Sequence, residues 1–316
     1  MRRVVAILGT LCLLQLGLTA CGDDDGDKKN TGSVTVTGEF GSAPTVSFHG
    51  QVNRVDTEYA VLTEGTGPEV ELDDTVFVHL YVGNGFTQEK ATSTWDDKKS
   101  VPIKVTKDTF KAFRESIVGH TVGSRVEALA TAKDAYDGQG NPDMGIGNQD
   151  SVVLVIDILD KVRETTDGTE KKAPARMPTV VEAGDKVTGL DFSKAGAPTG
   201  ELEVVTLVQG DGPAIKKGSP VALYYLGQVW DAKKSFDNNY DAEFPGIAGA
   251  SGQVEPITIG EGNVIKGWDQ GLVGVKAGSR VLLEIPARLG YGKKGSGKLI
   301  KGGDTLVFVV DVLGVG

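Results

Sequence analysis

Short apolar runs separated by glycine-containing turns fill the last third of the chain. They are rich in Val, Ile, Leu, Tyr and Thr, a composition typical of β-strands. We expect strands at residues 203–208, 220–230, 257–259, 280–286 and 305–313. One helix is predicted over residues 266–275, because Trp268, Leu272 and Val275 stand at positions i, i+4 and i+7 and form a single apolar face. A sheet wrapped on one short helix is an α+β arrangement.

An earlier part of the chain repeats this pattern. The run Gly-Ser-Arg-Val at residues 123–126 recurs at 278–281, and the apolar run at 151–158 recurs at 305–312. The order and the spacing of the two runs are nearly the same in both copies, which indicates an internal duplication into two domains. We place these domains at residues 44–162 and 200–316.

Two segments lack the apolar periodicity of a packed element. Residues 21–43 are rich in Gly, Asp, Lys, Thr and Ser, and residues 163–199 contain charged stretches together with Pro174 and Pro178. Such compositions are typical of solvated connections. We therefore expect a flexible tether at 21–43, and a linker with a lead-in to the second domain at 163–199.

The first residues resemble a bacterial lipoprotein signal. Arg2 and Arg3 precede an apolar run, residues 4–18, which is too short to span a bilayer comfortably. The run ends in Leu-Thr-Ala-Cys at Cys21, which resembles the lipobox. The resemblance implies a signal peptide at residues 1–20 and a lipid on Cys21, so the protein would be extracytoplasmic and anchored to the membrane of a bacterial cell envelope. The alternative is an ordinary signal peptide followed by a chance cysteine.

Composition narrows the possible functions. Cys12 lies inside the apolar leader, so Cys21 would have no partner thiol for a disulfide, and stability must come from apolar cores. The net charge of −10 and the lack of a Lys/Arg cluster argue against a nucleic-acid partner. The three histidines are scattered and no cysteines cluster, so we expect neither a metal nor a cofactor. Residues 292–298 nearly match a phosphate-binding loop, but Leu299 stands where that motif needs Ser or Thr.

Several ordered motifs in the second copy carry a specific resemblance. They are Tyr224-Tyr-Leu-Gly227, Ser235-Phe-Asp237, Val264-Ile-Lys-Gly-Trp-Asp-Gln-Gly-Leu272, Leu289-Gly-Tyr-Gly292 and Thr305-Leu-Val-Phe308. Residues 200–316 resemble the FKBP-type peptidyl-prolyl isomerases on these motifs. The resemblance implies two FKBP-like domains, each an antiparallel sheet wrapped around one short helix.

The family resemblance also implies a substrate pocket, transferred position by position. Trp268 would form the floor, with aromatic and aliphatic walls, tyrosines at the rim and a buried carboxylate. The catalytic positions are Tyr225, Phe236, Asp237, Ile265, Trp268, Tyr291 and Phe308, and the further substrate-binding positions are Val264, Ile257 and Leu299. One departure is Glu255-Pro256-Ile257, where the family often has an aromatic, so that wall would be aliphatic or more polar.

The implied activity is cis–trans isomerisation of X–Pro bonds in exported polypeptides. Rotation about the amide faces a barrier of about 18–20 kcal/mol, and a site that binds the twisted amide better than either planar isomer lowers it without covalent chemistry. The partners would be proline-containing polypeptides and macrolide inhibitors. Without the family motifs, Trp268, Phe236 and Phe308 would be read as ordinary core. The rival hypothesis is a non-catalytic chaperone or envelope interaction module on the same scaffold.

The first copy keeps the order of the strand and helix runs but not the pocket residues. Ungapped matching of the second strand places Leu80 opposite Tyr225. Matched motif by motif, the pair Trp95-Asp96 stands opposite Phe236-Asp237, and Phe113, Tyr136 and Leu154 replace Trp268, Tyr291 and Phe308. We expect weak or absent activity in this domain, which would serve as a spacer or a peptide-binding module.

Overall fold

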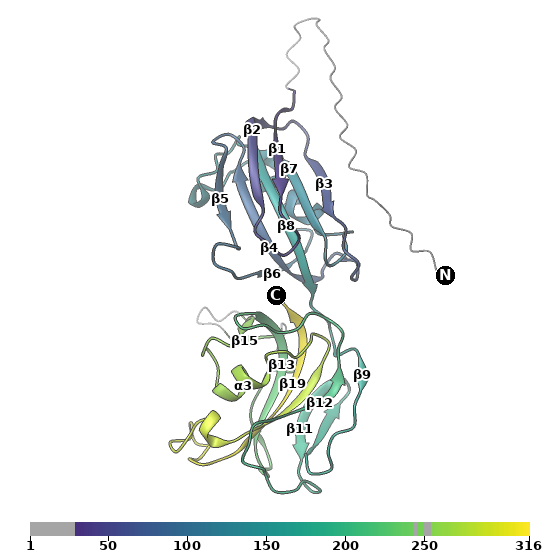
Figure 1. The fold of residues 1–316 in the computed structure, drawn as a ribbon, viewed down its shortest axis with the longest axis vertical. Coiled ribbons are helices and arrows are strands. Elements are labelled where there is room, and N and C mark those ends of the chain that lie inside the picture. The colour runs from purple at the N-terminus through teal and green to yellow at the C-terminus, as the bar shows by residue number, and fades with distance from the viewer. Residues whose placement is uncertain (1–28, 243–244, 249–253) are drawn as a thin grey trace, which may run out of the picture.

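The computed structural model describes residues 29–242, 245–248 and 254–316. The leader, Cys21 and residues 21–28 of the expected tether lie outside the described residues, and so does the side chain of Glu255. Figure 1 shows two domains joined end to end, with the C-terminus at the boundary between them. In the described part of the chain no helix has the length and apolar character needed to cross a membrane.

The first domain is an antiparallel sheet with two short helices. Its sheet has the order β3-β7-β8-β4-β5, and β6 pairs with β4. The elements are β1 (Thr31–Thr37), β2 (Thr45–Asn53), β3 (Glu58–Thr63), β4 (Thr75–Asn84), β5 (Glu89–Ser93), β6 (Val101–Lys104), α1 (Lys111–Glu115), β7 (Arg125–Ala130), α2 (Ala132–Tyr136), a 3₁₀ turn (Pro142–Met144) and β8 (Val152–Lys161).

The second domain repeats this topology. Its sheet has the order β14-β13-β19-β18-β12-β9, and β17 pairs with β13. The elements are β9 (Thr169–Glu170), β10 (Thr179–Ala183), β11 (Lys186–Asp191), β12 (Glu203–Gln209), β13 (Pro220–Val229), β14 (Ser235–Asn238), β15 (Ile247–Ala248), β16 (Val254–Glu255), β17 (Ile257–Thr258), α3 (Lys266–Gly271), β18 (Arg280–Ile285), a 3₁₀ turn (Ala287–Leu289) and β19 (Leu306–Val315).

The α+β expectation is confirmed, and the expected strands of the second domain are present. The helix begins at Lys266 as predicted but ends at Gly271, four residues before Val275. Leu272 is nevertheless fully buried, because the turn that follows α3 keeps it against the sheet. In each domain the inner face of the sheet packs on the short helix and forms the larger apolar core.

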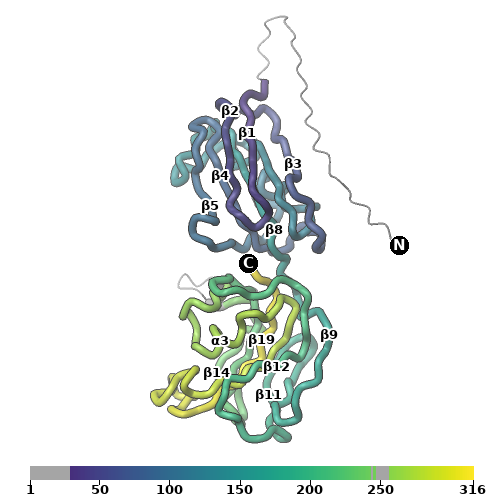
Figure 2. The backbone as a smooth tube through the Cα atoms, viewed as in Figure 1, coloured from purple at the N-terminus to yellow at the C-terminus, as the bar shows by residue number. Residues whose placement is uncertain are grey.

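Two hairpins occupy segments where we expected no packed element. The β1–β2 hairpin lies across the outer face of the first sheet (Figure 2), and the β10–β11 hairpin packs on the outer face of the second. The expected tether at 21–43 and linker at 163–199 are therefore wrong for these parts. Val34 and Val36 alternate with polar residues toward the sheet. So few apolar positions among Gly and Thr give a weak strand signal, and only the sheet beneath them makes their burial favourable.

A buried ion pair on each outer face connects the sheet to its hairpin. Arg125 binds Asp157 through two hydrogen bonds of 2.6 and 2.8 Å, and its remaining N–H groups donate to the carbonyls of Gly38 and Ser42 in the β1–β2 turn. Arg280 binds Asp311 in the same two-pronged way, at 2.5 and 2.7 Å, and also contacts Glu182 of β10. These Arg and Asp residues belong to the repeated runs noted in the sequence.

The two domains meet where their last strands end. Beyond β8, the Arg163 N–H donates to the Leu313 carbonyl over 2.9 Å, and Phe77 lies against Gly316. A salt bridge of 3.5 Å between Lys99 and Glu261 crosses the same boundary. The end of β19 therefore lies directly against the first domain.

Candidate functional site

One pocket of the second domain collects most of the predicted site residues. It encloses about 140 Å³ between β13, β14, β17, α3 and β19. Its lining consists of Tyr225, Phe236, Asp237, Ile257, Val264, Ile265, Trp268, Tyr291 and Phe308. The structure brings together every predicted pocket residue except Leu299, whose side chain is 64% exposed and is not part of the lining.

The floor of the pocket is an aromatic cluster around Trp268. Trp268 is 4% exposed and stands in the first turn of α3. Tyr225 and Phe308 meet it edge-on, each with ring centroids 5.1 Å from the indole and interplanar angles of 84° and 82°. Phe236 meets Phe308 at 5.6 Å in the same manner. Edge-to-face contacts of this kind hold the rings in defined positions.

The glycines of the helix motif allow α3 to lie close to β18. A Cβ on Gly267 would fall against Ile285, 2.7 Å from its Cδ1, and a Cβ on Gly271 would lie 2.8 Å from Leu283 Cδ2. Real side chains cannot make such contacts without a shift of the helix or the strand. The spacing Gly-Trp-Asp-x-Gly therefore brings Trp268 down to the sheet, where it forms the pocket floor.

Gly227 of β13 has a similar role for the side walls. A Cβ there would lie 2.6 Å from Phe308 Cε1 and 2.7 Å from Phe236 Cζ. The two rings can meet only because this position has no side chain. The motif Tyr-Tyr-Leu-Gly thus supplies the space for the aromatic walls and also Tyr225, which is buried against Trp268 and does not form an open rim as predicted.

Two tyrosines and a carboxylate form the polar edge of the pocket. The Tyr225 hydroxyl donates to Asp237 Oδ2 over 2.8 Å. Burial, followed by the hydrogen bond to Asp237, raises the pKa of the Tyr225 phenol well above its usual range. Tyr291 is 38% exposed, and burial together with the Asp237 charge raises its pKa as well. Both phenols therefore keep their protons at neutral pH, and the Tyr291 hydroxyl can donate to a bound carbonyl.

Two supporting side chains escaped the sequence reasoning. Asn239 accepts a hydrogen bond from the Tyr225 backbone N–H (2.6 Å) and donates to the carbonyls of Leu223 (3.0 Å) and Gly246 (2.6 Å). Asp269 accepts from two backbone N–H groups of the turn that precedes Val264, at 2.6 and 2.8 Å. No role is predicted for Asn239 from the sequence. Its position two residues after Asp237 was the available signal.

The matching of Trp95-Asp96 with Phe236-Asp237 is wrong. Thr94, just after β5, accepts from the Leu80 N–H as Asn239 accepts from the Tyr225 N–H. The positions of Phe236 and Asp237 are therefore taken by Ala91 and Thr92. Trp95 lies instead on the outer face, stacked on His79 with ring centroids 4.8 Å apart. The strand register decides which face a side chain takes, and the aromatic-Asp pair alone does not reveal that register. Leu80 does face the inner core, as expected.

Aromatic side chains occupy the corresponding region of the first domain. Phe113 takes the place of Trp268, and Phe110 precedes α1 as Ile265 precedes α3. Phe110, Phe113 and Tyr136 pack together with ring centroids 5.3 to 6.4 Å apart. Tyr136 is only 7% exposed, so it does not form an open rim like its counterpart Tyr291.

The lining of the second-domain pocket is mostly apolar. It contains no Ser, Cys, Lys or His, and its polar side chains are Asp237, Tyr225 and Tyr291. Among the described residues there is no group of three or more His, Cys, Asp and Glu side chains that could hold a metal. An antiparallel sheet wrapped on a short helix, with an apolar aromatic-floored pocket between them, defines the class of fold and site.

The family of the chain follows from known proteins of similar sequence. A sequence model described as FKBP-type peptidyl-prolyl cis-trans isomerase matches residues 212–313. An FK506-binding protein of Streptomyces anulatus is 36% identical over 127 residues, which make up 40% of this chain and 94% of the relative. An FK506-binding protein of Neisseria meningitidis serogroup A is 37% identical over 116 residues, or 37% of this chain and 97% of the relative.

A solved structure also matches. The crystal structure of AtFKBP13 is 29% identical, and the match covers 38% of this chain and 96% of that chain with a TM-score of 0.31. A score of this size carries no argument about the fold, so the assignment rests on the sequence relatives. The chain belongs to the FKBP family of peptidyl-prolyl cis-trans isomerases.

Proposed function

We propose that the second domain catalyses cis–trans isomerisation of X–Pro bonds in other polypeptides. The observation that supports this most is the aromatic floor, where Tyr225 and Phe308 meet Trp268 edge-on beneath a cavity of about 140 Å³. Pockets for drug-sized ligands usually enclose about 300–1,000 Å³. A cavity of the smaller size suits one side chain, such as the pyrrolidine ring of proline.

The mechanism follows from the electronic change during rotation. A twisted amide loses resonance, so its oxygen carries less charge than in either planar isomer, and a dry apolar pocket disfavours the planar forms more. Trp268, Phe236 and Phe308 would hold the proline ring and exclude water. The Ile265 N–H donates no hydrogen bond within the described residues, and it would anchor one substrate carbonyl while the Tyr291 hydroxyl holds another.

An NMR exchange assay on a short X–Pro peptide tests the proposal with the full-length protein. We expect Trp268→Ala to lower kcat/KM about tenfold or more, equivalent to at least ~1.4 kcal/mol of lost transition-state binding. The matched control is Phe113→Ala at the equivalent position of the first domain, which should leave the rate unchanged. Exchange no faster than the uncatalysed rate in the native protein would remove the proposal.

The same pocket is proposed to take macrolide inhibitors. The relatives bear the name FK506-binding protein, and Phe236, Ile265 and Trp268 form a comparable apolar surface here. Ile257 is fully buried and supplies an aliphatic wall where the family often has an aromatic. Titration with FK506, read by Trp268 fluorescence, should show saturable binding, and Trp268→Ala provides the control for the assignment of the signal.

We also propose that the protein works outside the cytoplasm, held by a lipid on Cys21, and acts on exported polypeptides. The support is the sequence alone, namely Arg2 and Arg3, the apolar run 4–18 and the small residues before Cys21. Incorporation of radiolabelled fatty acid, compared with Cys21→Ser, tests the anchor. Equal labelling of both proteins would contradict it.

For the first domain we propose a non-catalytic role as a spacer or peptide-binding module. Phe110, Phe113 and Tyr136 pack against one another in the region that forms the open pocket of the second domain. If this domain is inactive, the full-length Trp268→Ala variant should lose nearly all turnover. Substantial remaining activity that disappears with Phe113→Ala would assign catalysis to both domains.

A further inference from the structure

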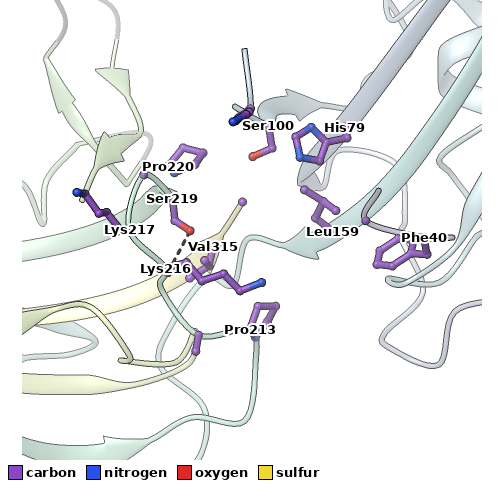
Figure 3. Close-up of a pocket in the computed structure, with 15 residues that line it drawn as sticks. Phe40, His79, Ser100, Leu159, Pro213, Lys216, Lys217, Ser219, Pro220 and Val315 are labelled. Atoms are coloured by element: carbon purple, nitrogen blue, oxygen red, sulfur yellow. Dashed lines mark hydrogen bonds between the residues drawn. The ribbon is translucent and has the colours of Figure 1, made fainter. Parts of the chain in front are cut away.

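A second cavity lies between the two domains, away from the proline pocket. It encloses about 480 Å³ and none of its lining residues belongs to the pocket around Trp268. The first domain contributes the β1–β2 turn, β4, β8 and the loop before β6, and the second contributes the β12–β13 loop and the end of β19 (Figure 3). A ligand in this cavity would therefore touch both domains.

The charged side chains that line the cavity are all cationic. They are Lys98, Lys216 and Lys217, and no Asp or Glu side chain lines the cavity, although the whole chain carries a net charge of −10. Gly316, the last residue of the sequence, also lines the cavity and places a backbone carboxylate beside these three cations. None of these three lysines forms a salt bridge within the described ranges, whereas the adjacent Lys99 pairs with Glu261. A cleft lined by charges of one sign attracts ligands of the opposite sign.

Two polar side chains of the first domain add hydrogen-bonding capacity. Ser100 is 6% exposed, its Oγ has no hydrogen-bond partner in the described structure, and it points toward the space between the domains (Figure 3). A buried hydroxyl without a partner is unfavourable, so a ligand acceptor there would satisfy it. His79 uses Nδ1 for Thr94 Oγ1, at 2.8 Å, and its other ring nitrogen remains for a ligand.

The remaining lining is mostly apolar. Phe40 and Leu159 stand on the first-domain side, and Pro213, Pro220 and Val315 stand on the other (Figure 3). Apolar walls with a few convergent polar groups, in a volume of several hundred Å³ at a domain boundary, are typical of small-molecule sites. Lys98 also adopts a left-handed backbone conformation, with φ of 54°. Such strain in a residue other than glycine concentrates at binding sites.

We propose that this interdomain cavity binds a small organic anion with a carboxylate or phosphate group and an apolar part. The lysines and the Ser100 hydroxyl would hold the anionic group, and Phe40 and Leu159 would cover the apolar part. The inference goes beyond isomerase activity and does not depend on it. Because the ligand touches both domains, its binding would stabilise their present arrangement.

Isothermal titration of the full-length protein tests the site with three matched probes. Phenyl phosphate carries both features, inorganic phosphate only the charge, and phenol only the ring, so we expect phenyl phosphate to bind most tightly and phenol not at all. Benzoate in place of phenyl phosphate distinguishes a preference for carboxylate from one for phosphate.

Charge variants locate the binding. K98Q/K216Q/K217Q should weaken phenyl phosphate binding about tenfold or more, and Ser100→Ala should weaken it several-fold. The control K293Q/K294Q/K298Q removes the same charge from the loop next to Tyr291 and should leave the affinity unchanged, as should Trp268→Ala. Absence of saturable binding at millimolar probe would overturn the proposal, and so would equal losses in both triple variants or loss in Trp268→Ala.

Discussion

The backbone N–H of Val315, at the end of the last strand, donates a 2.9 Å hydrogen bond to Oδ2 of Asp160 in the first domain. Asp160 is almost fully buried and also contacts Arg163, which begins the connection to the second domain. A single carboxylate thus joins the ends of both β8 and β19. The domain boundary is therefore built from the same two strands that form the centre of each sheet.

This carboxylate predicts a pH dependence of stability. Burial raises the pKa of Asp160 to about 6, against an opposing effect of Arg163, so the folded protein holds the proton more tightly than the unfolded chain. Its stabilising contribution is then fully present below about pH 4 and disappears as the pH rises through about 6. With 1.36 kcal/mol per pKa unit, the change is at most about 3 kcal/mol.

Asp160→Asn should remove that contribution to the pH dependence. Urea unfolding at pH 4 and at pH 6.5 should show a smaller loss of stability in the variant than in the native protein. The control is Asp167→Asn, which removes an exposed carboxylate that also pairs with Arg163. It should keep the native dependence of stability on pH. A native profile in Asp160→Asn would contradict the assignment.

Gly227→Ala should disrupt the proline pocket while the sheet remains folded. The new methyl group would overlap the rings of Phe308 and Phe236, whose contact forms the pocket wall. We expect a stability loss of about 1–3 kcal/mol from overpacking and a fall in kcat/KM of at least about tenfold. Both are measured by urea unfolding and by NMR exchange. Gly189→Ala in β11, where a Cβ meets nothing within 4 Å, should change neither.

The approach of α3 to β18 predicts a coupled pair of substitutions. Gly267 packs on Ile285, and the first domain carries the smaller pair Ala112 and Ala130 at the equivalent positions. Gly267→Ala alone should destabilise by about 1–3 kcal/mol, and Ile285→Ala alone by about 2–5 kcal/mol. In the double variant the new methyl group occupies the space that the Ile285 side chain vacates. Its loss of folding stability should therefore be smaller than the sum of the two single losses. Additive losses in a double-mutant cycle would show that the two positions do not share this space.

Arg125→Ala should detach the β1–β2 hairpin and destabilise the first domain. It leaves Asp157 buried without its counterion and removes the donors to Gly38 and Ser42. Breaking one partner of a buried pair costs about 3–5 kcal/mol, which urea unfolding can measure. Hydrogen exchange should accelerate in β1 and β2 before the rest of the sheet. Lys90→Ala, which breaks an exposed pair with Asp96, should cost less than about 1 kcal/mol; comparable losses would argue against a special role for Arg125.

The strands of the second domain could be predicted because their buried residues form continuous apolar runs along the chain. Strands β13 and β19 carry long apolar runs, and Trp268 and Leu272 lie on one face of a short helix, so neither needs information from elsewhere in the chain. The hairpins could not be predicted in this way. Val34, Val36 and Val180 become buried only through contact with a sheet formed by distant residues.

The same distinction separates the pocket residues that could be predicted from those that could not. The ordered family motifs predicted Trp268 and its neighbours as pocket residues, because the resemblance transfers each position along the chain. The mismatch of Trp95 arose because a strand's register, and hence the face of each side chain, depends on pairing with a partner strand. Asn239 was missed for a related reason, since its three hydrogen bonds reach backbone groups of two other segments.

By itself, the sequence determined the duplication and the α+β class, because both depend on residue type and spacing along the chain. Its ordered motifs also carried the resemblance that predicted the family and the side chains around the Trp268 pocket. Only the tertiary structure decided the two outer hairpins with their Arg–Asp pairs, the packing of Phe110 against Phe113 and Tyr136, and the lysine-lined cavity between the domains. These features depend on which distant groups come within a few ångströms of one another. The cavity in particular lies where the ends of two separate sheets meet, beside the hydrogen bond between Val315 and Asp160.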